Sequence, residues 1–215
     1  GARPNIKAIT DIARKYGALV VWDCSHAAGA ISLDFEKNGV DLAVGCTYKY
    51  GNSGPGSPAW LFVSKRIQTE LRVPIQGWFS QEKQFEMGPF YEPAETIRRF
   101  QIASPSIIGI RGVQVAYEMI EEAGIEAIEA KAALGTQLMI ALHDAWLKPL
   151  GFELGTPRDP KLRGGHIILK HKDADVGVAV ALDFGLITPI IFKAQTKGLV
   201  EISNEVKELA GLAKA

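Results

Sequence analysis

A lysine that leads into a glycine-rich loop is the part of the sequence with the clearest chemical potential. Lys49 follows the apolar segment Asp41–Cys46 and precedes the loop Gly51–Gly56. We expect that segment to be a strand buried on both faces, so the lysine at its end should lose solvation. Desolvation lowers the pKa of a lysine and frees a neutral, nucleophilic amine. The pattern therefore favours Schiff-base chemistry at Lys49.

A carboxylate that we expect to be buried stands at the end of a second apolar run. Asp23 closes the segment Ala18–Trp22, and the ends of parallel strands meet at one edge of a sheet. Pyridoxal phosphate would use both side chains: Lys49 would bind its aldehyde as an imine, and Asp23 would keep its pyridine nitrogen protonated. The spacing alone fits equally well with an Asp23 that caps a turn and a Lys49 that extends into solvent.

Three further side chains could contact such a ligand. His26 could stack on or hydrogen-bond a bound ring, or be an ordinary packed side chain. Tyr48 could bind a phosphate or fill space beside the strand, and Trp78 could contact a ligand or anchor its own loop. The loop is not a Walker A motif, because Lys49 precedes the glycines.

The elements that must position these residues alternate between helix and strand. The pattern predicts a helix over Asn5–Tyr16 and strands over residues 18–23, 41–46 and 59–63. Such alternation is typical of an α/β domain with a mostly parallel sheet. An aromatic, proline-rich loop, Pro74–Phe100, follows.

The rest of the chain predicts a second, smaller domain of α+β type. Ser104 and Pro105 give an N-cap and first-turn signal for a helix to Ala123. A long helix should follow over Ile125–Leu147, then a strand pair within residues 152–154 and 166–171, and a helix over Asp175–Asp183. We therefore divide the chain into a large domain, residues 1–123, and a small domain, residues 124–215.

Composition limits the classes of partner. Lysine plus arginine and aspartate plus glutamate both number 24, and no run of like charge favours nucleic acid or a membrane surface. This balance of charge favours a small-molecule ligand. No apolar run is long enough for a membrane span. Cys24 and Cys46 are too few for a disulfide framework or a thiolate metal site, and His166 and His171 should face opposite sides of a strand. These features predict a cytoplasmic protein without a metal.

The strand-end motifs resemble one enzyme family. The segments Trp22–Ala30 and Val40–Ser57 closely resemble kynureninase, a pyridoxal-phosphate enzyme with the aspartate aminotransferase-type fold, also called fold type I. The segments Gly77–Phe79, Tyr91–Pro93 and Arg163–His166 extend the similarity, which covers roughly residues 5 to 187. Related cysteine desulfurases typically carry glutamine in place of His26 and a His-Lys pair in place of Tyr48-Lys49.

The resemblance implies a role for each candidate residue. Lys49 would carry the cofactor and later act as general base, Asp23 would pair with the pyridine nitrogen, and His26 would lie beside the ring. Tyr48 would bind the phosphate and help in proton transfer. Trp78 and Ser104 match positions that reach the phosphate from the neighbouring subunit, so a homodimer with shared active sites is implied.

The implied reaction is hydrolysis of L-kynurenine, or of its 3-hydroxy form, to an anthranilate and L-alanine in tryptophan catabolism and NAD biosynthesis. The chain departs from the family pattern at two places. It lacks the upstream half of the large domain, so we expect a fragment, and it has no arginine after Arg163 to clamp the substrate carboxylate. Thr188-Pro189 could rejoin the pattern after an internal deletion. The alternatives are another class V enzyme, such as a cysteine desulfurase or lyase, and a non-catalytic truncated dimerisation module.

Overall fold

The chain forms two compact units in its computed structural model, which describes residues 1–172, 174–177, 180–182, 185–187, 190–192 and 196–214. The N-terminal unit is Ala2–Leu134, and the C-terminal unit is Gly135–Ala215 together with Gly1. The boundary between the units lies within the helix α3 (Ile125–Leu142). The assignment of residues 1–123 and 124–215 to a large and a small domain stays a prediction.

The N-terminal unit is built around a short mixed sheet. Its elements before α3 are α1 (Ile6–Lys15), β1 (Val21–Asp23), β2 (Leu42–Gly45), β3 (Trp60–Val63), the 3-10 turns η1 (Trp78–Ser80) and η2 (Ile97–Phe100), and α2 (Ile107–Ala123).

The helix α1 begins and ends where its sequence signals lie. The Asn5 side chain accepts a hydrogen bond from the Ala8 N–H at 3.0 Å, which satisfies one free donor of the first turn. Gly17, with φ of +68°, follows the last turn in the left-handed region that glycine adopts without strain. The predicted helix over Asn5–Tyr16 is thus confirmed with its ends shortened by one residue.

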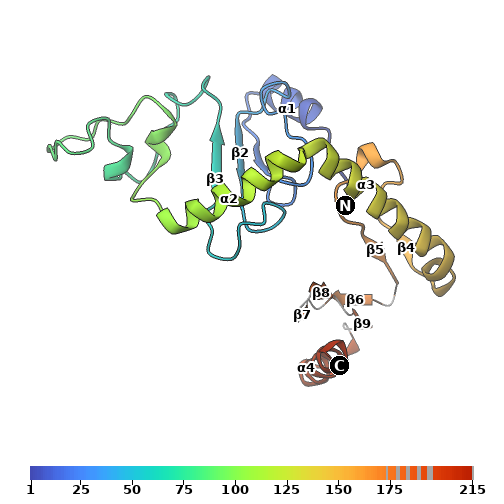
Figure 1. Cartoon of the computed structure of the whole chain (residues 1–215). Coiled ribbons are helices and arrows are strands. Elements are labelled where there is room, and N and C mark those ends of the chain that lie inside the picture. The colour runs from blue at the N-terminus through green and yellow to red at the C-terminus, as the bar shows by residue number, and fades with distance from the viewer. Residues whose placement is uncertain (173, 178–179, 183–184, 188–189, 193–195, 215) are drawn as a thin grey trace. The chain divides into compact units, whose positions relative to one another are not determined.

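The sheet has the order β1-β2-β3, shown in Figure 1 for the two labelled strands β2 and β3. β1 pairs with β2 in parallel, with Asp23 opposite Val44, and β2 pairs with β3 antiparallel, with Gly45 opposite Trp60. A side chain at Gly45 would meet the Trp60 ring at 2.5 Å, so this register requires glycine. The prediction of a mostly parallel sheet is therefore correct for the pair β1 and β2 but not for the pair β2 and β3.

The core of this unit lies on one face of the sheet. Cys24, Val40 and Ala43 are buried there. The side chains packed against them are Ile6, Trp22, Ala27, Leu33, Phe35, Trp60 and Phe62. The Trp22 indole N–H donates to the Thr10 hydroxyl at 3.2 Å and ties α1 to β1.

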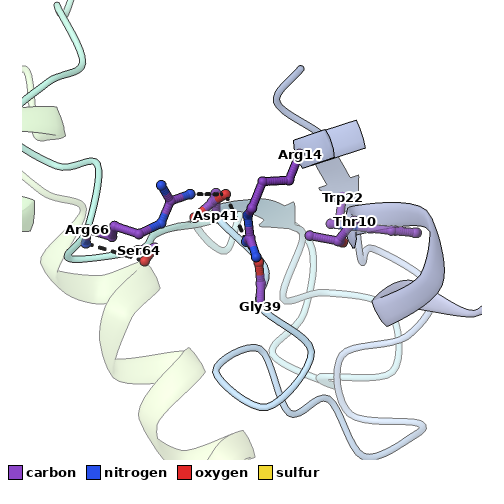
Figure 2. A network of polar contacts seen from close by, with 7 residues as sticks. All are labelled: Thr10, Arg14, Trp22, Gly39, Asp41, Ser64 and Arg66. Atoms are coloured by element: carbon purple, nitrogen blue, oxygen red, sulfur yellow. Dashed lines mark hydrogen bonds and ion pairs between the residues drawn. The ribbon is translucent and has the colours of Figure 1, made fainter. Parts of the chain in front are cut away.

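A polar network braces the other end of the strands, where β2 begins (Figure 2). Only 9% of the Asp41 side chain is exposed, and its carboxylate accepts hydrogen bonds from Arg14 and Arg66. Arg14 also donates to the Gly39 carbonyl. Because Arg14 belongs to α1 and Arg66 follows β3, one buried acid links three segments of the fold.

The helix α2 begins two residues later than predicted. The Ser106 hydroxyl, not Ser104, accepts the hydrogen bond from the Gly109 N–H at 3.3 Å. Pro105 therefore precedes the N-cap and is not part of the first turn. The helix packs on the loop after β2, because side chains at Gly109 and Gly112 would contact Pro58 and the Ser53 carbonyl at 2.9 and 3.3 Å.

The C-terminal unit contains the second half of α3 and several short elements. They are η3 (His143–Leu147, a π-helical turn), η4 (Lys148–Leu150), β4 (Glu153–Leu154), η5 (Pro160–Leu162), β5 (Leu169–Lys170), β6 (Ala174–Gly177), β7 (Val180–Leu182), β8 (Gly185–Ile187), β9 (Ile190–Phe192) and α4 (Leu199–Lys214).

Antiparallel pairing dominates this unit. β4 pairs with β5, which confirms the predicted strand pair, and the helix predicted to reach Leu147 continues as the π-helical turn η3. The helix predicted over Asp175–Asp183 is wrong, because β6 and β7 occupy its described residues. These strands pair with β9 and β8, respectively. Val176 in β6 and Val180 in β7 are β-branched and favour a strand over the helix that we predicted from this segment.

Candidate active site

The ends of β1 and β2 bring Asp23 and the Lys49 loop to the same edge of the sheet. Asp23 is the last residue of β1 and lies opposite Val44, near the end of β2. Both strands run in the same direction, so the segments that follow them leave the sheet together. The predicted juxtaposition of Asp23 and Lys49 follows from this register.

The Lys49 amine lies against the His26 ring. Its Nζ is 3.0 Å from Nε2 and 3.5 Å from Nδ1 of His26, and 5.9 Å from the centre of the Tyr48 ring. Ammonium has no acceptor, so the amine donates to whichever imidazole nitrogen carries no proton. Lysine and histidine, from two different strand ends, thus form one polar pair.

The Asp23 carboxylate is held by Ser25. The Ser25 N–H donates to Asp23 Oδ1 at 2.9 Å. Hydrogen bonds from the Ser25 hydroxyl and N–H lower the pKa of Asp23, with smaller contributions from Lys49 and His26, while burial acts in the opposite direction. The site therefore favours an ionised carboxylate beside a lysine and an imidazole.

The predicted burial of these groups is wrong. Asp23 is exposed and Lys49 is only half-buried. β1 lies at the edge of the described three-stranded sheet, and Val21 on this strand is 60% exposed. A strand at the edge has no neighbour on one side, so the residues at its end keep contact with solvent. The described exposure of Lys49 therefore does not support the desolvation that we expected there.

Two glycines allow the segments around the site to approach closely. Gly29 has φ of +83°, and a Cβ there would lie 2.6 Å from the Tyr50 carbonyl oxygen. A Cβ at Gly51 would lie 2.4 Å from the Thr47 carbonyl oxygen and 2.9 Å from the Tyr117 ring. Gly29 thus lets the turn after His26 lie on the Lys49 loop, and Gly51 lets that loop lie on α2.

Hydrogen bonds shape the loop that follows Lys49. The buried Thr47 hydroxyl donates to the Pro58 carbonyl at 2.8 Å, and the Ser53 N–H and hydroxyl both donate to the Thr47 carbonyl. The Asn52 N–H donates to the Lys49 carbonyl at 3.1 Å. The glycine-rich segment is therefore an ordered turn that fixes the backbone on both sides of the lysine.

Sequence reasoning missed two residues of this site. Ser25 was identifiable, because a residue two positions after an aspartate commonly donates its N–H to that side chain. Tyr117 gave no signal, since it lies in a regular helix far along the chain. Its hydroxyl is buried beside Cys46 and has no hydrogen-bond partner among the described residues, and burial raises its pKa.

Trp78 and Ser104 are not joined to Lys49 by any hydrogen bond or ring contact that the structure describes. Trp78 packs edge-on against Phe79 and Phe85, with ring centres 4.5 and 6.1 Å apart, respectively. It also lines a surface pocket of about 240 Å³ with other residues of its own segment. Ser104 is exposed just before α2. Their predicted role at a phosphate stays a prediction.

The donor set at the strand ends fits pyridoxal phosphate. An aldehyde needs a primary amine, a pyridinium nitrogen needs an anionic acceptor, and an aromatic ring can lie beside an imidazole. Lys49, Asp23 and His26 provide these three groups within one cluster. Tyr48 adds an exposed phenol next to the lysine.

Neither a metal centre nor a membrane span appears in the part of the chain that the structure describes. No group of three or more histidine, cysteine, aspartate or glutamate side chains there is arranged to hold a metal ion. Within the same residues, no helix combines the length and the apolar character needed to cross a membrane.

Comparison with known families gives one match over most of the chain. Residues 1–164 match the family described as aminotransferase class-V. Residues 162–215 match a different family, the catalytic domain of 2-oxoacid dehydrogenase acyltransferases. The second match covers well under half of the chain.

Several curated relatives of the chain are bacterial kynureninases. The chain is 33% identical to the enzyme of Pseudomonas fluorescens over 87% of its own length and 45% of the relative's. It is 32% identical to the enzyme of Deinococcus radiodurans over 99% of its own length and 53% of the relative's. The chain thus spans about half the length of these relatives.

Among solved structures, an apo cysteine desulfurase from Thermococcus onnurineus NA1 superposes with a TM-score of 0.62. The two sequences are 18% identical, and the superposition includes 96% of this chain and 55% of the desulfurase. This likeness confirms the predicted fold, that of the fold type I pyridoxal-phosphate enzymes. The family match and the relatives also indicate pyridoxal phosphate as the cofactor, as predicted. The chain belongs to the aminotransferase class-V family, and within it the sequence is similar to the kynureninases.

Proposed function

We propose that the chain carries the cofactor-binding lysine of a kynureninase-type hydrolase. The reaction is hydrolysis of L-kynurenine, or 3-hydroxykynurenine, to the corresponding anthranilate and L-alanine. The observation that carries the proposal is the cluster of Lys49, His26 and Asp23 at the ends of two parallel strands. The similarity to kynureninases supports the choice of substrate.

Each side chain of the cluster has a distinct task in this proposal. Pyridoxal phosphate, when bound, supplies an electron sink for the bonds at the substrate Cα. Lys49 binds the cofactor and, once released from it, takes the proton from Cα as general base. The ionised Asp23 holds a proton on the pyridine nitrogen.

The flanking residues orient these groups. His26 fixes the Lys49 amine through their 3.0 Å contact and lies beside the cofactor ring. Tyr48 binds the phosphate and passes a proton through its phenol. Trp78 and Ser104 act at the phosphate of a neighbouring subunit. This role fits their exposed positions and their lack of a described contact to Lys49.

The wider setting also belongs to the proposal. We place the protein in the cytoplasm, in tryptophan catabolism and NAD biosynthesis, as a homodimer with shared active sites. Cys24 and Cys46 form no disulfide in the structure, which is consistent with that compartment. The exposure of Trp78, Phe85 and Phe90 supports a partner surface, since large aromatic side chains are enriched at interfaces.

A spectroscopic titration tests cofactor binding. We expect pyridoxal phosphate to give the purified chain an absorbance band near the visible edge that is lost in Lys49→Ala. Lys37→Ala, which removes an exposed lysine from a turn of the same unit, is the matched control and should retain the band. A band that survives in Lys49→Ala would contradict the assignment of the lysine.

A substrate comparison separates the proposal from its alternatives. Kynurenine should be turned over faster than cysteine by the chain loaded with cofactor. Faster release of sulfide from cysteine would favour a desulfurase, which has the same fold. A third outcome would favour a non-catalytic dimerisation module. In that case the chain forms a dimer with or without Lys49, binds no cofactor and turns over neither compound.

A further inference from the structure

Arg99 is a buried cation that the described part of the chain does not neutralise. The residue lies in η2 and is only 9% exposed. Its Nε is enclosed and makes no hydrogen bond, and its guanidinium has no ion pair or ring contact among the residues that the structure describes. Arginine is almost never buried to this extent in proteins unless it is paired. The position of Arg99 therefore requires an explanation that the fold alone does not give.

The preceding residue shows how an arginine of the same turn is satisfied. Arg98 donates to the carbonyl and to the carboxylate of Glu82, at 2.8 and 3.4 Å, respectively. Its side chain is 36% exposed, so water also solvates its charge. Of two consecutive arginines, the more exposed one has a counter-ion and the buried one does not.

Acidic side chains stand close to Arg99 in the sequence, yet none of them is described as its partner. Glu82 and Glu86 form ion pairs with other cations. Glu92 and Glu95 are exposed, and the structure describes no ion pair for either of them. The segment that contains Arg99 thus does not supply the counter-ion.

Hydrogen bonds and packing hold the backbone around Arg99. The Arg99 N–H donates to the Thr96 carbonyl at 3.0 Å, and η2 packs against η1. Ser80 of η1 and Ala94 are fully buried, and the Ala94 N–H donates to the Ser80 carbonyl at 2.8 Å. An ordered part of the fold therefore carries this cation, and a buried charge is costly unless a partner compensates it.

The chemistry of the guanidinium identifies the kind of partner that is missing. Its planar fork matches two oxygens of a carboxylate or phosphate, which it can bind through two parallel hydrogen bonds. Among the described contacts, Nε is the only nitrogen of this group that is both enclosed and without a partner. The two terminal nitrogens also lack a described partner, so they keep contact with the surface, where an anion can reach them.

We propose that Arg99 is the anchor of a binding site for an oxyanion, namely the carboxylate or phosphate group of a small molecule. Both groups present the pair of oxygens that the fork recognises, and the experiment below distinguishes them. The site goes beyond the proposed function, because anion binding at Arg99 does not depend on a cofactor at Lys49.

Nuclear magnetic resonance of the chain in chloride buffer tests the site. The Nε–H signal of Arg99 is assigned as the one lost in Arg99→Lys. It is then followed during titration with inorganic phosphate or with acetate at constant ionic strength. We expect the signal to shift and reach saturation with at least one of these anions, and the anion that saturates it at the lower concentration identifies the preferred group. A signal that saturates with neither anion would overturn the proposal.

Urea unfolding separates a specific site from a general effect of salt. The saturating anion should raise the urea midpoint of the unmodified chain more than that of Arg99→Met, because a ligand stabilises only the folded state that binds it. Arg98→Met removes the neighbouring, paired arginine and should keep the full increase. Equal increases in all three chains would overturn the proposal.

Arg99→Lys provides a second variant that keeps the charge. Lysine lacks the planar fork, so we expect this variant to bind the anion at least about ten-fold more weakly than the unmodified chain. It decides the question even if Arg99→Met does not fold. An Arg99→Lys chain with the same anion-dependent increase in midpoint as the unmodified chain would contradict recognition by the guanidinium.

Discussion

Replacement of Gly29 by alanine tests the contact that brings the two strand-end loops together. Gly29 has φ of +83°, where an alanine costs about 1–2 kcal/mol. Its Cβ would also lie 2.6 Å from the Tyr50 carbonyl oxygen, and this oxygen belongs to the backbone of an ordered loop. Overpacking of this type costs about 1–3 kcal/mol. The two effects together predict a loss of about 2–5 kcal/mol in the free energy of unfolding.

Two other glycines separate these effects. Gly54 has φ of +81°, but a Cβ added there would have no atom within 4 Å, so Gly54→Ala should lose only the conformational part, about 1–2 kcal/mol. Gly135 in α3 has neither feature, and Gly135→Ala should stabilise the chain by about 0.5–1 kcal/mol.

Urea unfolding followed by tryptophan fluorescence provides the measurement, because Trp22 and Trp60 both pack against the core of the N-terminal unit, and Trp146 lies in the C-terminal unit with Gly135. Gly29→Ala should also weaken cofactor binding, since it displaces the His26 turn from the Lys49 loop. A Gly29→Ala chain that is no less stable than Gly54→Ala would refute the reasoning, because the close contact with Tyr50 would then cost nothing.

Two further predictions concern acidic residues far from the lysine. Asp41→Ala should lower the free energy of unfolding by about 1–2 kcal/mol, because the buried carboxylate holds two partly exposed arginines. The control is Asp11→Ala, which removes an exposed acid paired with Lys7 and should cost under about 0.5 kcal/mol in the same urea assay. Equal effects of these two changes would contradict a bracing role for Asp41. Hydrogen bonds from Arg158, and to a lesser extent from His143, hold the pKa of Asp144 well below its usual range. Asp144 therefore stabilises the fold above about pH 4, and this stabilisation is lost as the pH falls through the lowered pKa. The stability difference between the unmodified chain and Asp144→Asn should therefore shrink in urea titrations as the pH falls from about 4 toward about 2, and a constant difference would exclude this linkage.

Local sequence signals predicted the elements that hold the site. The apolar periodicity between Asn5 and Gly17, and the runs that end at Asp23 and Cys46, determine a helix and two strands from neighbouring residues alone. The parallel pairing of β1 and β2 agrees with the predicted α/β pattern, although turns and not a helix connect the two strands. Sequence patterns are most informative for elements of this kind, whose formation depends on residues close together in the chain.

Properties that depend on distant segments could not be predicted in the same way. The burial expected for Asp23 requires neighbours on both sides of β1, and the described sheet supplies only one. The position of Tyr117 behind Gly51 depends on how α2 packs, which no local pattern encodes. The strands that replace the helix predicted over Asp175–Asp183 depend on pairing with β8 and β9.

The central claim is that Lys49 carries the cofactor. The most direct test is to incubate the chain with pyridoxal phosphate, reduce it with borohydride and locate the added mass by peptide mapping. The account predicts that the modification lies on Lys49 and that it disappears in Lys49→Ala but not in Lys37→Ala. A modification spread over exposed lysines, or none on the peptide that contains Lys49, would contradict the claim.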